Sequence, residues 1–150
     1  GHGAVVGRQL LTWAARLHEI GLSIAYSGYH RHGAYLVANS EMPGFSRADQ
    51  DLLATLVLGQ RKKLTREIFA ALPPTAAELA LRLCVLLRLA VRLARSRSPR
   101  PLPPFSIGAR KSTLELSFPA DWIEGHPLTH ADLVEEASKI QGVGFELKVR

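Results

Sequence analysis

The sequence predicts an α+β protein that is mainly helical, and three observations lead to that class. Apolar residues recur at three- and four-residue steps before residue 97, as amphipathic helices require, and alternate with polar residues after residue 104, as strands require. Between these parts, residues 97–104 contain four prolines, which lack backbone donors and favour an extended chain. We therefore predict a helical domain over 1–98, a Pro-rich linker over 99–104 and a small subdomain over 105–150.

The first two helices follow from apolar spacing and capping residues. Leu10, Ala14 and Leu17 lie on one stripe of a helix over 8–20, which Gly21 is placed to end. Ser27 is expected to cap a second helix that runs to about residue 39.

The next two helices begin at capping-box patterns. Ser46 and Asp49 are three residues apart and precede an apolar face, which predicts a third helix that ends in the cationic segment 60–63. Thr75 and Glu78 repeat the pattern and are expected to open a long helix that continues to about residue 96.

The small subdomain is predicted to contain three short strands and one helix. Alternating apolar residues place the strands at 105–107, 114–118 and 145–149. Thr129 and Asp132 are expected to cap the helix, which covers one face of the three-stranded sheet. The predicted order is therefore strand, strand, helix, strand.

Composition and charge limit the classes of partner. A hydrophobic content of 47% with 21% charged residues excludes a disordered chain. Nineteen Lys and Arg against thirteen Asp and Glu give a net charge of +6, which attracts polyphosphate, nucleotides, nucleic acid or an acidic domain. A basic surface without a specific partner is the alternative.

The single cysteine and the absence of a leader-like start predict a cytoplasmic protein. Cys84 has no internal disulfide partner and lies in an apolar helix, where we expect it to serve packing. The apolar segment 79–94 contains three arginines, which favours a buried helix over a membrane span.

Seven segments carry motifs in a recognisable order: 11–22, 29–36, 43–47, 61–64, 114–122, 126–129 and 144–145. Together they resemble the C-terminal domain of the bacterial exopolyphosphatase and guanosine pentaphosphate phosphohydrolase family. The resemblance implies a helical domain like that of the His-Asp phosphohydrolases. It also implies an N-terminal actin-like catalytic domain elsewhere in the parent chain, which uses a divalent cation such as magnesium.

His18 and Glu19 stand where His-Asp phosphohydrolases carry a metal-binding pair. On a continuous helix these two side chains diverge, and Tyr26 and Gln60 replace histidines that the family pattern often has. We therefore expect no metal site and no catalytic residue in this chain. Polar contacts at a helix interface are expected instead for His18, Glu19, His30 and His32.

A cluster of cations after the third helix is the candidate polyphosphate-binding site. Its predicted members are Arg61, Lys62, Lys63 and Arg66, and Arg31 joins them if the second and third helices pack side by side. Such groups bind phosphates through charge-assisted hydrogen bonds. A solvated helix end is the alternative.

Arg88, Arg92 and Arg95 share a face of the long helix. That face could meet polyphosphate, an acidic surface or a second subunit, but simple snorkelling of the side chains is the preferred interpretation.

The sequence thus predicts an accessory domain that binds polyphosphate and helps an exopolyphosphatase to dimerise. One alternative is an autonomous metal-dependent phosphohydrolase. The other is a nucleic-acid-binding module, which the sequence supports by charge but with little aromatic interleaving among the cations.

Overall fold

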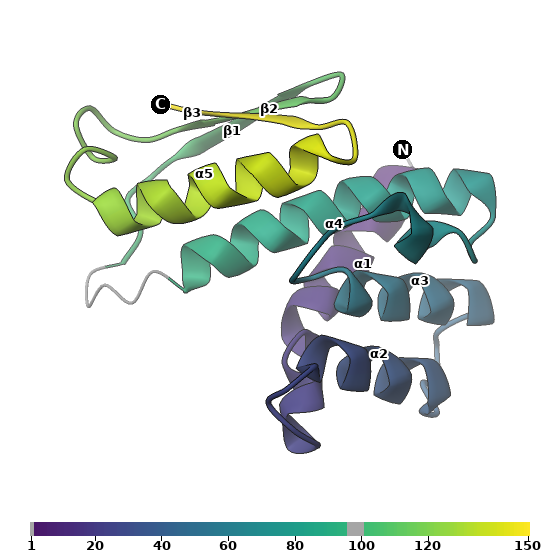
Figure 1. The fold of residues 1–150 in the computed structure, drawn as a ribbon. Helices are drawn as coiled ribbons and strands as arrows, with labels where there is room; N and C mark the ends of the chain where they lie inside the picture. Colours follow the sequence, from purple (N-terminus) through teal and green to yellow (C-terminus); the bar gives the residue numbers. More distant parts are fainter. Residues whose placement is uncertain (1, 96–100) are drawn as a thin grey trace. The chain divides into compact units, whose positions relative to one another are not determined.

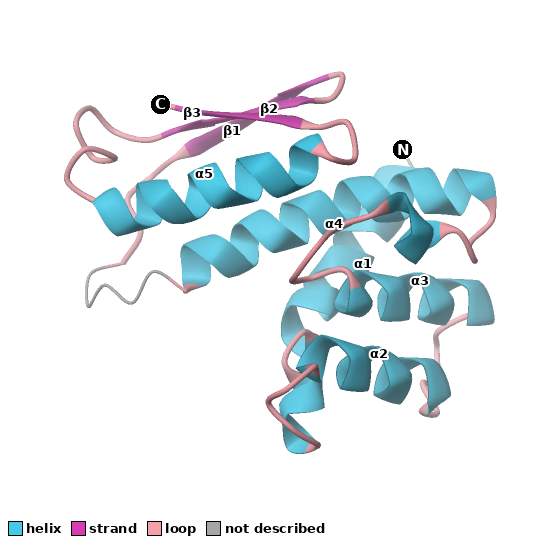
Figure 2. Ribbon diagram, in the orientation of Figure 1, coloured by secondary structure: helices cyan, strands magenta, loops and turns pink. Residues whose placement is uncertain are grey.

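A computed structural model of the chain describes residues 2–95 and 101–150 and confirms the predicted mainly helical α+β class (Figures 1 and 2). The chain forms two compact units, Gly1–Arg88 and Leu89–Arg150, which divide within the helix α4. Of the predicted linker, residues 99 and 100 lie outside the described residues, and residues 101–104 have no regular secondary structure. No helix among the described residues is long and apolar enough to cross a membrane.

The helices of the first part are α1 (His2–Leu17), α2 (Tyr29–Asn39), α3 (Arg47–Leu58) and α4 (Pro74–Ala94), with 3₁₀ turns η1 (Ile20–Ser23) and η2 (Arg66–Phe69). The predicted cap of α3 is confirmed, because the Ser46 hydroxyl oxygen accepts a hydrogen bond from the Asp49 amide at 3.0 Å. The helix ends earlier than predicted, at Leu58, and the cationic segment after it forms a turn.

The first helix also ends earlier than predicted. It stops at Leu17, and the chain turns through η1, where Gly21 lies directly against α2. A Cβ on Gly21 would be 1.8 Å from the Tyr29 carbonyl oxygen, so only glycine permits this approach. The chain therefore leaves the helix at Leu17, and the last turn that the apolar stripe predicted, up to residue 20, does not form.

Two other predicted caps are wrong. Gly28, with φ +66°, precedes α2 in place of Ser27, because the chain enters this helix through a left-handed residue. The helix α4 begins at Pro74, so Thr75 already lies within its first turn; the fixed φ of proline suits that first position.

The core of the first unit lies where α4 meets α3 and α1. Ala14, Leu53 and Val85 are completely buried, and so is Leu87 on another side of α4. The helices α2 and α3 pack side by side, as the candidate cation cluster requires.

The second unit contains β1 (Ser106–Arg110), β2 (Thr113–Ser117), α5 (Pro127–Gln141) and β3 (Glu146–Val149), which confirms the predicted order. The strand β2 is central, antiparallel to β1 and parallel to β3. Leu114 and Leu116 are buried on the face that α5 covers (Figure 1). The predicted Thr129 cap is wrong, because α5 begins two residues earlier, at Pro127.

Candidate functional site

The candidate site is built on the turn that follows α3. Gly59 ends the helix, and its amide donates to the Thr55 carbonyl at 2.9 Å. Gln60 is buried, Arg61 is partly exposed, and Lys62 and Lys63 are exposed. Lys62 has φ +67°, a left-handed conformation that costs a non-glycine residue about 1–2 kcal/mol. The turn therefore needs contacts that hold it.

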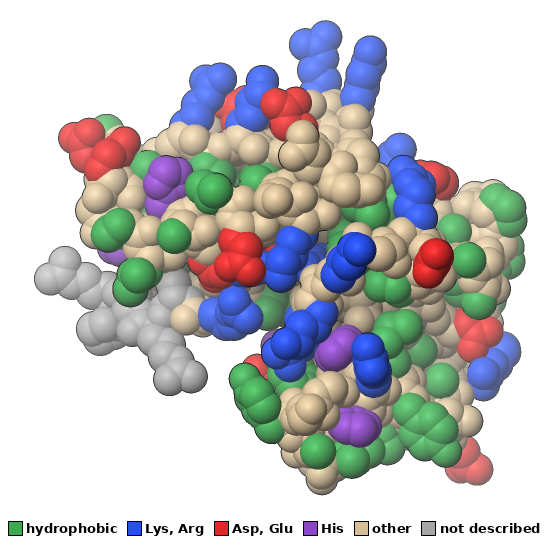
Figure 3. All heavy atoms as spheres, viewed as in Figure 1, with side chains coloured by type: hydrophobic (Ala, Val, Ile, Leu, Met, Phe, Trp, Pro, Cys, Tyr) green, Lys and Arg blue, Asp and Glu red, His purple; other side chains and the backbone are tan. Residues whose placement is uncertain are grey.

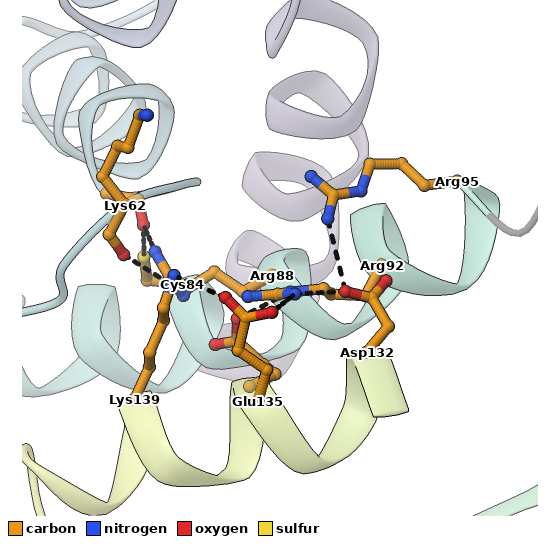
Figure 4. A network of polar contacts seen from close by, with 10 residues as sticks. Lys62, Cys84, Arg88, Arg92, Arg95, Asp132, Glu135 and Lys139 are labelled. Carbon is orange, nitrogen blue, oxygen red and sulfur yellow. Dashed lines mark hydrogen bonds and ion pairs between the residues drawn. The ribbon is translucent and has the colours of Figure 1, made fainter. Parts of the chain in front are cut away.

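Those contacts come from α4 (Figure 4). The buried Arg88 donates from Nη1 to the Gly59 carbonyl and from Nη2 to the Lys62 carbonyl, each at 2.7 Å. The Cys84 thiol donates to the same Gly59 carbonyl at 3.3 Å. Arg88 is only 1% exposed, so the predicted snorkelling is wrong for this residue; its guanidinium stays inside to bond backbone oxygens.

Arg61 stacks on aromatic rings from the loop before α2 and from its first turn. Its guanidinium carbon lies 4.3 Å from the centre of the Tyr29 ring and 5.8 Å from that of Tyr26. Both distances are within the range of cation–π attraction. Tyr26 is 75% exposed, so much of its ring remains accessible beside the cation.

The pKa of His30 is affected by three of the predicted cations. Burial lowers the pKa of His30, and the positive charges of Arg61, Arg31 and Lys62 lower it further, with a smaller contribution from His32. Cations from α2 and from the turn therefore act on one buried imidazole, and the lowered pKa favours its neutral form at pH 7. Figure 3 shows Lys and Arg side chains beside histidines on the face of the first unit that is in view.

The remaining predicted cations lie in different surroundings. Arg66 belongs to η2, where its Nη1 lies 3.5 Å from a carboxylate oxygen of Glu78 on α4. Lys63 is exposed at the end of the turn. Polyphosphate binding by Arg31, Arg61, Lys62, Lys63 and Arg66 stays a prediction. We define the basic cluster as Arg31, Arg61 and Lys62, the three whose charges lower the pKa of His30.

The end of α1 also approaches the turn. The Gln60 side-chain amide donates to the His18 carbonyl, while Gln60 Oε1 and His30 Nδ1 are buried and have no hydrogen-bond partner within the described part of the chain. The turn is thus anchored by α1 and α4 together. Sequence spacing gave no signal for either contact, because the partners are far apart along the chain.

His18 and Glu19 do not diverge as predicted. His18 Nε2 lies 3.6 Å from Glu19 Oε1, because α1 has ended at Leu17 and helical geometry no longer separates the two side chains. The other ring nitrogen, Nδ1, is 2.6 Å from the Ala15 carbonyl oxygen. His32 makes a comparable backbone contact, with Nε2 3.0 Å from the Ser27 carbonyl oxygen.

The described residues do not bring together three or more His, Cys, Asp or Glu side chains that could hold a metal ion. Among these residues, the pair formed by His18 and Glu19 is therefore not a complete donor set for a metal ion.

A second polar network lies in the second unit (Figure 4). Arg92 is buried and pairs with Asp132 and, at 3.0 Å, with the buried carboxylate of Glu136. Burial alone lowers the pKa of Arg92, but hydrogen bonds and charges of Asp132 and Glu136 raise it overall. Arg95 adds a contact of 3.3 Å to Asp132. Snorkelling is therefore wrong for the buried Arg92, which carboxylates of α5 hold, whereas Arg95 remains exposed.

The family model described as Ppx/GppA phosphatase, domain III, matches residues 4–137. The chain belongs to this family. The resemblance noted in the sequence is thereby confirmed, and both the basic cluster and the Arg92 network lie within the matched domain III residues.

Two relatives of this Ppx/GppA domain are named guanosine-5'-triphosphate,3'-diphosphate pyrophosphatase. The one from Pseudoalteromonas translucida is 39% identical over 146 residues, which is 97% of this chain and 29% of the relative. The one from Aeromonas hydrophila is 34% identical over 143 residues, 95% of this chain and 29% of the relative. The chain thus spans less than a third of these proteins, as expected for one domain of a larger phosphatase.

Proposed function

We propose that this chain is the accessory domain of a phosphohydrolase that removes a terminal phosphate from guanosine pentaphosphate or polyphosphate, and that it binds the substrate's phosphate chain. The observation that carries the proposal is the turn that presents Arg61 and Lys62, in which Arg61 stacks on Tyr29 of α2; the charges of Arg61, Arg31 and Lys62 also lower the pKa of the buried His30. In a member of a phosphatase family, such a surface suits a phosphate polymer. The names of the two relatives support guanosine pentaphosphate as the substrate, and the net charge of +6 is compatible with either substrate.

The cations differ in what they offer a phosphate chain. Arg61 has a planar guanidinium that is pre-oriented by the Tyr29 ring, so little freedom is lost when it binds. Lys62 and Lys63 are exposed ammonium groups that can follow a flexible polymer. Because His30 is neutral, a bound polyanion would favour its protonation and raise its pKa.

The test is a titration of the 150-residue chain with long-chain polyphosphate at two salt concentrations. Changing Arg61, Lys62 and Lys63 to Ala should weaken binding. It should also reduce the slope of log affinity against log salt concentration by about 2, since each lost phosphate contact contributes roughly 0.7 to that slope. Changing the exposed Arg110, Lys111 and Lys148 removes the same charge from the second unit and serves as the control. Equal losses in the two triple variants would refute the proposed surface.

We also propose that the whole protein contains the actin-like catalytic domain and is a homodimer to which the second unit contributes. Exposed apolar side chains on α5, with Leu128 85% and Val134 54% exposed, support a role in assembly. Sedimentation velocity of the whole protein with Leu128→Glu and Val134→Glu should show a smaller species. An unchanged sedimentation coefficient would contradict this assignment.

The two alternatives predict different results in the same preparation. An autonomous phosphohydrolase would release phosphate from polyphosphate after divalent metal is added, whereas an accessory domain would release none. A nucleic-acid-binding module gains support from Tyr26 and Tyr29 beside Arg61, an aromatic interleaving that the sequence had not indicated. Displacement of polyphosphate by single-stranded RNA, when the concentration of nucleotide units equals that of phosphate units, would support the nucleic-acid-binding alternative.

A further inference from the structure

Arg88 bonds the two ends of the turn that carries Arg61 and Lys62. The carbonyls of Gly59 and Lys62 are three residues apart, and each accepts one hydrogen bond of 2.7 Å from a different nitrogen of the same guanidinium. A planar fork with fixed donor directions defines the separation and orientation of its two acceptors. The contact therefore fixes the shape of the turn as well as its position (Figure 4).

The backbone within this turn does not hold its conformation unaided. Lys62 adopts φ +67°, which side-chain-bearing residues rarely populate. A residue persists there when surrounding contacts determine its conformation, and the bond from Arg88 to the Lys62 carbonyl is such a contact. Loss of that bond would allow Lys62 to return to a commoner conformation and redirect the side chains beside it.

Arg61 lies between the two bonded carbonyls. Its guanidinium reaches Tyr29 only if the turn keeps its shape, and its charge and that of Lys62 act on His30 from the same turn. Arg88 itself is 1% exposed, so it is not available to a ligand in solution.

We infer that Arg88 is a positioning residue for phosphate binding: it fixes the turn that presents Arg61 and Lys62 and does not touch the phosphate chain. This inference rests on the proposed function of the basic cluster. Arg88 is far from the turn along the chain, so the sequence alone gives no indication of this role.

The first test needs no ligand. Arg88→Lys keeps the charge but removes the planar fork, so Arg61 and Lys62 should move away from His30. Nuclear magnetic resonance titration of the 150-residue chain should then show a higher pKa for His30, with the charges of Arg31 and His32 still present. Arg82→Lys, at an exposed position of α4, is the matched control and should leave that pKa unchanged. An unchanged His30 pKa in folded Arg88→Lys would overturn the inference.

The second test is a cycle of variants in polyphosphate titration. Arg88→Lys should weaken binding about tenfold in the natural chain, and should have no further effect once Arg61 and Lys62 are both Ala. A loss that is equal in both backgrounds would overturn the positioning role, because Arg88 would then act by another route. If Arg88→Lys does not fold, Arg88→Gln, whose one amide nitrogen cannot reproduce the two-nitrogen fork, takes its place in both tests.

The two tests separate the inference from the function on which it rests. A natural chain that binds no polyphosphate would refute the proposed function of the cluster. The His30 titration would in that case still decide whether Arg88 shapes the turn.

Discussion

Gly59 provides the most direct test of how the turn is packed. Its backbone, at φ −83° and ψ 0°, has a negative φ and lies in a region that alanine can adopt. A Cβ at this position would nevertheless lie 2.6 Å from the sulfur of Cys84, well inside normal contact distance. Space, and not backbone conformation, therefore requires glycine here.

The expected magnitude is the difference between two opposing effects. Replacing glycine by alanine stabilises a compatible site by about 0.4–1 kcal/mol, because the unfolded chain loses freedom. Overpacking a tight interior costs about 1–3 kcal/mol. Gly59→Ala should therefore destabilise the natural chain by about 1–2 kcal/mol.

The Cys84→Ala background should reverse that sign. Without the sulfur the new methyl group has room, so Gly59→Ala should be neutral or stabilising there, and the coupling between the two sites should be about 1–3 kcal/mol. Guanidinium unfolding of the four chains, followed by circular dichroism, measures it. Gly28→Ala is the control, since φ +66° and open space make its cost independent of Cys84. An equal cost of Gly59→Ala in both backgrounds would refute the reasoning.

Three further predictions concern pH, the second unit and the ligand. Because the pKa of His30 is lowered in the folded chain, the unfolded chain takes up its proton first as pH falls below about 6.5. The free energy of unfolding should therefore decrease as pH is lowered, by up to about 1.4 kcal/mol per pH unit, until the pH reaches the pKa of the folded state. Urea unfolding between about pH 7.5 and 5.5 measures this slope, and His30→Gln should flatten it. Arg92→Met removes buried contacts to Asp132 and Glu136 and should cost about 3–5 kcal/mol in denaturant unfolding, where a cost below about 1 kcal/mol would show that the network adds little. Tyr26→Leu should weaken the binding of guanosine pentaphosphate by about 1–3 kcal/mol, because the base loses a ring to stack on, and should weaken polyphosphate binding much less. Calorimetric titration measures both, and equal losses would exclude base stacking at this ring.

The sequence by itself determined the class, the order of elements and the family. These depend on patterns over a few residues: the step of three or four along a helix, the alternation in strands, and the Ser46 cap that the structure confirms. Family membership likewise follows from motifs in order along one chain. Helix ends were less well predicted, since Pro74 and Gly28 act where Thr75 and Ser27 were expected.

The tertiary structure alone decided how the site is held. Arg88 has the spacing of a surface cation, yet it is buried because two backbone oxygens, 26 and 29 residues away, accept its donors. Arg61 meets Tyr29 only after α2 and α3 pack side by side. A periodicity reports which face of an element a residue occupies, whereas burial of a charge depends on partners that folding brings from distant parts of the chain.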